Sequence, residues 1–187
     1  MATTLKKSLG RIEIIMGCMF SGKSTEIIKI INKYKILNKK IMAITHSIDN
    51  RYNSTANIVT HDKLMHKCIN STTLTPLNNT DLYKNADVIV IEEAQFFPDL
   101  YKFVINGVEK DKKTLIIAGL DGDYKREPFG DILKLIPHAE KVTKLEALCL
   151  ICNNGTPAAF TKRIVESTEQ TLVGSNDSYV AVCREHL

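Results

Sequence analysis

Hydrophobic and polar residues over the first 45 positions follow the order expected of a β-α-β unit. An apolar run at 12–16 lies between Gly10 and Gly17, as expected of a strand buried in a parallel sheet. From residue 24 to about 38, apolar positions recur at helical spacing with lysines between them. Residues 41–45 are apolar again, so the pattern predicts a strand, a helix and a second strand.

The pattern weakens between His46 and Thr80, where Asn, Ser and Thr are frequent and a long loop is predicted. A loop of this length inside a compact domain is usually either mobile or functional. Four branched apolar residues at 88–91 then predict a central strand. After it, a helix with Pro98 in its first turn is predicted to run to about Lys110.

The rest of the chain continues this alternation. Residues 114–119 predict another buried strand, a helix is expected to end just before Pro137, and residues 141–148 predict a further strand. Strands that alternate with helices are typical of a parallel sheet. The expected fold is therefore α/β, with helices flanking the sheet.

Composition places the chain among ordinary soluble globular proteins. Its 187 residues are 44% hydrophobic and 25% charged, enough for one full core with at most a small second domain. No apolar run approaches the roughly 20 residues of a membrane span, and residues 1–10 lack the apolar core of a secretory signal. We therefore expect a cytoplasmic protein without a membrane partner.

The formal net charge of +4 comes largely from lysines along the first predicted helix and its exit. These are Lys29, Lys33, Lys35, Lys39 and Lys40. A solvated helix face explains them better than a nucleic-acid surface does, because basic blocks are common on exposed helices. No nucleic-acid partner is predicted from charge.

The segment from Gly17 to Ser24 reads G-x-x-x-x-G-K-S and joins the first predicted strand to the first predicted helix. In a phosphate-binding loop of this spacing, backbone N–H groups and the helix N-terminus surround the phosphates. Lys23 would reach the β- and γ-phosphates, and the Ser24 hydroxyl would bind Mg²⁺. A chance glycine-rich turn is disfavoured because spacing, strand and helix all agree. The segment predicts nucleoside triphosphate binding.

Two acids, Glu92 and Glu93, follow the central strand at the edge where ligands bind in open α/β sheets. In phosphate-loop enzymes an acid at this place helps to hold Mg²⁺, and Glu92 takes that position. Glu93 is expected to face the other way and to accept a proton from an attacking hydroxyl. The alternative is that both acids simply end the strand.

Three further side chains leave two interpretations open. Arg51 would either reach a phosphate or lie solvated in its loop, with equal weight. Tyr124 and Phe129, in the turn-rich segment after residue 119, would either line a flat apolar slot for a base or pack in the core. The sequence does not decide between these alternatives.

The cysteines fall into a pattern that predicts a metal site. Cys149-x₂-Cys152 and Cys183-x₂-His186 are two pairs separated by 30 residues, and zinc takes four such ligands in a tetrahedron. The alternatives are unrelated reduced thiols or a redox pair. Because four protein ligands leave no open position, we expect a structural Zn²⁺. Cys18 is given no role in this pattern, and neither is Cys68.

With these residues in view, the chain resembles the type II (cellular and poxvirus-like) thymidine kinases from about residue 11 to residue 186. The matching segments, in order, are Met19–Thr25, Arg51–Tyr52, Thr60–Asp62, Gln95–Asp99, Leu120–Gly122, Pro128–Gly130, Thr161–Arg163 and the two cysteine pairs. The resemblance implies a RecA-like phosphate-loop core over residues 1–147. It also implies a small zinc-binding domain over 148–187, whose lasso loop closes over the nucleoside.

The resemblance further implies a reaction and its residues. Glu93 would take the proton from the thymidine 5′-hydroxyl, which attacks the γ-phosphate of ATP and gives thymidine monophosphate; Ser24 and Glu92 would hold Mg²⁺. The implied ATP-binding residues are Gly17, Cys18, Met19, Phe20, Ser21, Gly22, Lys23, Ser24, Asp49, Asn50, Arg51, Glu92, Ala94 and Gln95. The implied nucleoside-binding residues are Met19, Phe96, Leu120, Tyr124, Phe129, Gln170, Thr171, Leu172, Val173, Gly174 and Tyr179.

Family members are commonly homotetramers inhibited by thymidine triphosphate, and both properties are expected by resemblance. The chain departs from the family pattern at four places: Glu92 stands for Asp, Ala94 for Gly, Cys18 for Pro and His186 for the fourth zinc cysteine. The rival hypothesis is a zinc-ribbon ATPase that acts with nucleic acid. A weaker alternative is a structural protein that binds ATP without turnover.

Overall fold

The computed structural model describes residues 9–48, 57–59, 65–172 and 177–187. Its centre is a six-stranded sheet in the order β5-β2-β6-β7-β1-β8, in which all neighbouring strands are parallel. The strand bounds are β1 (Arg11–Gly17), β2 (Ile41–His46), β5 (Ile69–Ser71), β6 (Val88–Ile91), β7 (Thr114–Gly119) and β8 (Lys141–Leu145). The α/β prediction is confirmed.

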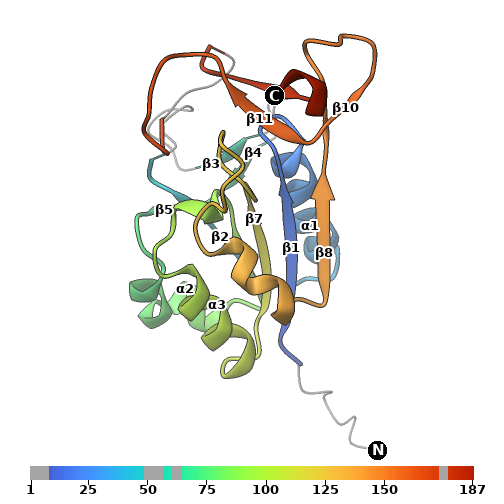
Figure 1. The fold of residues 1–187 in the computed structure, drawn as a ribbon. Coiled ribbons are helices and arrows are strands. Elements are labelled where there is room, and N and C mark those ends of the chain that lie inside the picture. The colour runs from blue at the N-terminus through green and yellow to red at the C-terminus, as the bar shows by residue number, and fades with distance from the viewer. Residues whose placement is uncertain (1–8, 49–56, 60–64, 173–176) are drawn as a thin grey trace, which may run out of the picture.

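Helices cover both faces of this sheet (Figure 1). On one face α1 (Lys23–Ile36) buries Ile27 and Ile31 against Val90 and Ile116 of the sheet. The elements of the other face are η1 (Thr75–Asn79), α2 (Asp81–Asn85), α3 (Leu100–Glu109) and the 3₁₀ helix η3 (Ile132–His138). They share a second core with the other sides of the strands, because a parallel strand is apolar on both faces.

The predicted long loop at 46–80 contains more structure than its polar sequence indicated. Strand β5 extends the sheet by pairing Ile44 of β2 with Ile69, and β3 (Asn57–Val59) pairs with β4 (Met65–Lys67). Each of these strands has only three residues, too few to show an alternating pattern. The five-residue α2 was missed for the same reason.

Three predicted element ends are wrong. Helix α3 begins at Leu100, so Pro98 precedes it, and the Asp99 carboxylate accepts N–H bonds from Leu74 and Thr75. Pro137 lies inside η3 instead of following an α-helix, because this helix is a short 3₁₀ segment. The last predicted strand ends at residue 145, after which the chain leaves the sheet.

A smaller lobe stands at the carboxyl edge of the sheet (Figure 1). It consists of β9 (Ala147–Leu148) with β10 (Pro157–Ala158), β11 (Phe160–Arg163) with β12 (Tyr179–Val182), and η4 (Arg184–His186). Its core includes Cys18 of the phosphate loop, whose thiol donates to the carbonyl of Ala158 at 3.3 Å. The lobe therefore packs directly on that loop, and the domain boundary at 147/148 stays a prediction. None of the described helices has the length and apolarity needed to cross a membrane.

Candidate active site

The segment from Gly17 to Ser24 connects β1 to α1, as predicted. Gly17 has φ +149°, and a Cβ here would overlap the carbonyl oxygen of Leu145 on β8, so only glycine fits. Lys23 Nζ donates to the carbonyls of Gly17 at 3.1 Å and Cys18 at 2.7 Å. Burial lowers the pKa of Lys23, and the Glu93 carboxylate opposes that shift.

This loop offers hydrogen-bond donors suited to a phosphate. The Ser21 hydroxyl is buried and has no hydrogen-bond partner within the described residues. The loop also leads into the N-terminus of the 14-residue helix α1, where anions are stabilised by free N–H groups. An unsatisfied buried hydroxyl beside a helix N-terminus and a lysine fits a bound phosphate.

The two acids after β6 diverge. Glu92, 9% exposed, accepts a short hydrogen bond from the Ser24 hydroxyl of α1. Glu93 turns away in the left-handed region, with φ 52°, and accepts a bond from Gln95 Nε2 at 2.6 Å. Two oxygen ligands from separate elements suit Mg²⁺, which Ser24 and Glu92 would hold with the phosphates.

A pocket opens beside Glu93, with a volume of about 690 Å³ that includes its mouth. Apolar side chains line much of it, and Lys23, Glu93 and Asp123 bring charge to it. All predicted nucleoside residues that the structure describes reach this pocket: Met19, Phe96, Leu120, Tyr124, Phe129, Gln170, Thr171, Leu172 and Tyr179. A pocket lined mainly by apolar side chains, with a few polar groups that converge on it, is typical of a small-molecule site.

The pocket shows which interpretation holds for Tyr124 and Phe129, which the sequence left open. Tyr124 lines it and is not core, and its ring stacks against the Arg163 guanidinium carbon at 3.7 Å. Phe129 does both, because it is 7% exposed, lines the pocket and meets Phe96 edge-on at 5.4 Å between ring centroids.

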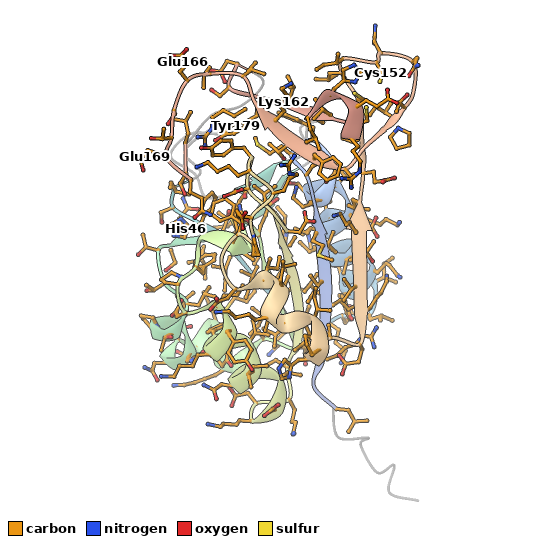
Figure 2. All side chains as sticks on the ribbon, viewed as in Figure 1. His46, Cys152, Lys162, Glu166, Glu169 and Tyr179 are labelled. Atoms are coloured by element: carbon orange, nitrogen blue, oxygen red, sulfur yellow. The ribbon has the colours of Figure 1, made fainter. Side chains whose placement is uncertain are left out.

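The loop after β11 is held closed over the pocket by Arg163. Its guanidinium donates to the carbonyls of Ser167 at 3.0 Å, Glu169 at 2.6 Å and Gln170 at 3.1 Å. A further bond of 2.8 Å reaches the Tyr179 hydroxyl. Figure 2 shows Glu169 and Tyr179 on this side of the lobe above His46, with Cys152 on the opposite side.

The four predicted metal ligands converge. Cys152 Sγ and Cys183 Sγ are 3.6 Å apart, and His186 Nδ1 lies 3.7, 3.4 and 3.3 Å from the sulfurs of Cys149, Cys152 and Cys183. Ligands of a tetrahedral zinc are about 3.6 to 3.8 Å apart for usual Zn–S and Zn–N distances. The cluster therefore fits Zn²⁺, with Nδ1 as the histidine donor.

The thiols of Cys149 and Cys152 differ in how readily they ionise. Burial opposes ionisation of Cys149, but backbone N–H groups from Cys152, Cys183 and Ile151 outweigh it and lower the pKa of Cys149 to about 6. Burial and the Cys183 sulfur raise the pKa of Cys152 to about 11. A divalent cation would favour the thiolate at both positions.

Several pocket residues were missed by the sequence reasoning. Ile48 and Asp123 line the pocket, and Thr161 accepts a bond from the Met19 N–H at 3.0 Å. Thr161 stood in a segment matched to the family, which was the only signal for it. The predicted residues Asp49, Asn50, Arg51, Val173 and Gly174 lie outside the described residues. Ala94 is fully buried, and Gln95 directs its amide toward Glu93 and Leu120.

The parallel sheet, the loop of Gly17 to Ser24 and the acids at the end of β6 define a phosphate-loop nucleotide-binding protein. The family model described as thymidine kinase matches residues 10–187, and the chain belongs to the thymidine kinase family.

Similar proteins agree with this assignment. Thymidine kinase 1 of Dictyostelium discoideum is 43% identical over 94% of this chain and 76% of that protein. The thymidine kinases of Yaba monkey tumor virus and of vaccinia virus strain Ankara are 44% and 42% identical. Each match covers 94% of this chain, and 93% and 96% of the viral proteins respectively.

Proposed function

We propose that this protein transfers the γ-phosphate of ATP to the 5′-hydroxyl of thymidine, giving thymidine monophosphate. The observation that carries the proposal is the divergence of the two acids after β6. Glu92 meets the phosphate loop through Ser24, whereas Glu93 faces the apolar pocket. Membership of the thymidine kinase family supplies the identity of the acceptor.

On the donor side, the segment from Gly17 to Ser24 binds the triphosphate. Lys23, now bonded to its own loop carbonyls, exchanges those bonds for phosphate oxygens. Ser24 and Glu92 would hold Mg²⁺, which would neutralise charge on the phosphates. Glu is one methylene longer than Asp, and its direct bond to Ser24 supports its reaching the same place.

On the acceptor side, thymine lies between the aromatic walls of Phe96, Phe129 and Tyr124. The main chain of Gln170 to Leu172 faces the edge of the base. Glu93 takes the proton from the 5′-hydroxyl as its oxygen attacks the γ-phosphorus. Phosphoryl transfer needs mainly positioning and charge neutralisation, and a closed loop also excludes water as a competing acceptor.

Zn²⁺ has a structural role in this proposal, since Cys149, Cys152, Cys183 and His186 leave it no open position. The metal ligands are far from the phosphate loop in the sequence, and the apolar core that contains both Cys18 and Cys149 joins the two. The metal would thus stabilise the lobe from which the loop of residues 164–172 projects.

Family resemblance supports three further properties. We expect a homotetramer, inhibition by thymidine triphosphate and a cytoplasmic location, with neither a nucleic acid nor a membrane as partner. Lys29, Lys33 and Lys35 of α1 are exposed, as a solvated helix face requires.

The test is product formation from thymidine, deoxycytidine and deoxyguanosine with Mg·ATP, in the wild type and in Glu93→Gln. We expect thymidine monophosphate from thymidine and a fall in kcat of at least about 100-fold in the variant, as for loss of a general base. Thermal stabilisation by Mg·ATP should persist in Glu93→Gln, because Glu93 lies outside the phosphate loop.

If ATP binds but no nucleoside is phosphorylated, the kinase proposal fails. ATP hydrolysis stimulated by single-stranded DNA would then favour the zinc-ribbon ATPase. Full activity in Glu93→Gln would leave the kinase proposal standing but show that Glu93 is not the general base.

A further inference from the structure

The side-chain amide of Gln95 bridges Glu93 and the end of β7. Gln95 lies in η2 (Ala94–Phe96), directly after the acid, and is 4% exposed. Its Oε1 accepts the backbone N–H of Leu120 at 3.0 Å, and its Nε2 donates to Glu93 Oε2 at 2.6 Å. Because a backbone N–H only donates, the amide oxygen must face Leu120 and the nitrogen must face Glu93.

Two glycines leave room for Gln95. A Cβ on Gly119, the last residue of β7, would overlap Gln95 Oε1. A Cβ on Gly130, which has φ +62°, would overlap the Gln95 backbone carbonyl. Gln95 is therefore closely packed, with its amide oxygen against β7 and its backbone against the turn around Gly130.

A partner for the Glu93 side chain matters because the Glu93 backbone conformation is itself energetically unfavourable. A non-glycine residue in the left-handed region is strained and persists only where its surroundings hold it. A bond to one carboxylate oxygen restricts the rotation that would turn this side chain out of the pocket.

We propose that Gln95 is a positioning residue, which holds the Glu93 carboxylate toward the acceptor pocket and keeps it ready to accept the 5′-hydroxyl proton. The inference rests on the function proposed above. It replaces the expected contact of Gln95 with ATP by a role exerted through Glu93.

Other charged groups also face Glu93 and stay in place in the variants below. Among the described residues, Lys23 on α1 and Asp123 after β7 line the same pocket, and His46 at the end of β2 interacts with the Glu93 carboxylate. Glu92 precedes it in the chain. A shift that appears only when residue 95 changes therefore reports on the amide.

The first experiment compares Gln95→Glu with Gln95→Met in the full-length, zinc-loaded enzyme. Glutamate keeps an oxygen for Leu120 but sets a second acid against Glu93, so the pair retains one proton to higher pH. We expect the acid limb of kcat/KM for thymidine to move up by about one pH unit or more. Methionine removes both bonds without adding charge, so the acid limb should move less than in Gln95→Glu while kcat falls about 10- to 100-fold.

The second experiment is a double-mutant cycle of Gln95→Met with Gly119→Ala. The alanine methyl group displaces Gln95 Oε1 and also lies 3.2 Å from the backbone nitrogens of Ala94 and Gln95, so the two changes share one contact. We expect Gly119→Ala to lower kcat, and the loss in the double variant to be smaller than the two single losses combined. Mg·ATP-dependent thermal stabilisation should remain in each variant, because the phosphate loop is untouched.

An unmoved acid limb in Gln95→Glu would overturn the proposal. If that variant does not fold, additive losses in the Gly119 cycle would overturn it instead. A wild type that phosphorylates no nucleoside refutes the proposed function, whereas an active wild type with insensitive Gln95 variants refutes this inference alone.

Discussion

At the scale of single residues, the site depends on side chains whose surroundings change their chemistry. His46 packs against Phe96 and Phe97 with ring centroids 5.6 and 4.9 Å away, and its Nδ1 accepts the N–H of Ile48 at 3.1 Å. Burial lowers the pKa of His46 below its ordinary 6.5, although Glu93 opposes the shift. The neutral ring therefore suits the folded state.

This environment predicts a pH dependence of stability. Between the lowered folded pKa of His46 and 6.5, the unfolded chain binds more protons than the folded one. The free energy of unfolding should consequently fall as the pH drops below about 6.5, the ordinary pKa of histidine. His46→Gln cannot titrate and should flatten this slope in urea unfolding measured from pH 7.5 to 5.

The control for this prediction is His138→Gln, which removes an exposed imidazole beside Tyr101. His66, whose pKa burial also lowers, is intact in both variants, so a residual slope is expected. If the free energy of unfolding depends on pH equally in the wild type and in His46→Gln, His46 is not the source of the pH dependence.

At the scale of elements, the position of the loop of residues 164–172 depends on the side chain of Arg163. The planar guanidinium of Arg163 on β11 bonds three carbonyls of this loop and stacks on Tyr124. Gln170 adds a bond of 2.9 Å from Nε2 to Asp123 Oδ2. An ammonium group lacks the flat fork that makes several such bonds at once.

We therefore expect Arg163→Lys to loosen this loop without touching the phosphate loop. The KM for thymidine should rise about 10-fold, the cost of roughly one charge-assisted hydrogen bond, while the KM for ATP stays unchanged. Steady-state kinetics with each substrate varied in turn measures both values. Arg184→Lys makes the same chemical change over Phe160, 4.8 Å from the ring centroid, and serves as the control. Equal effects on both KM values would argue against this role.

At the scale of the whole molecule, the metal cluster and the phosphate loop belong to one packed unit. The core around Cys149, Ala158 and Val182 includes Cys18, and Thr161 on β11 accepts the Met19 N–H. The lobe is small and has few buried apolar residues, so it needs a cross-link to stay folded. The cysteine and histidine ligands join its first strand to the end of the chain.

Removal of zinc should accordingly unfold the lobe before the sheet. A structural zinc contributes about 10 to 16 kcal/mol of apparent binding free energy in small domains, so its loss outweighs the other contacts of the lobe. Chelation should abolish thymidine phosphorylation and expose residues 148–187 to proteolysis, while the six-stranded sheet keeps its circular dichroism. Re-addition of Zn²⁺ should restore activity. Full activity after complete chelation would show that the lobe folds without metal.

Local pattern determined much of this protein. The phosphate loop, the central strands and the two cysteine pairs were predicted from sequence, because the chemistry of each is carried by neighbours in the chain. Short elements such as β5 and α2 were missed, since three to five residues show no period. The helix ends predicted from Pro98 and Pro137 were wrong, because proline is compatible with both a helix start and a 3₁₀ turn and specifies neither.

Tertiary structure decided which residues meet across the sheet edge. The sequence left Tyr124 and Phe129 open between slot and core, and only the fold placed both at the pocket. The sequence contained no signal that Gln95 bonds to both Glu93 and Leu120, or that Arg163 donates to the carbonyls of a loop. Gln95 and Leu120 are 25 residues apart in the chain, and parallel strands bring their carboxyl ends together only after the sheet has formed. Local bonding sets the elements, whereas the geometry of the reaction depends on their packing.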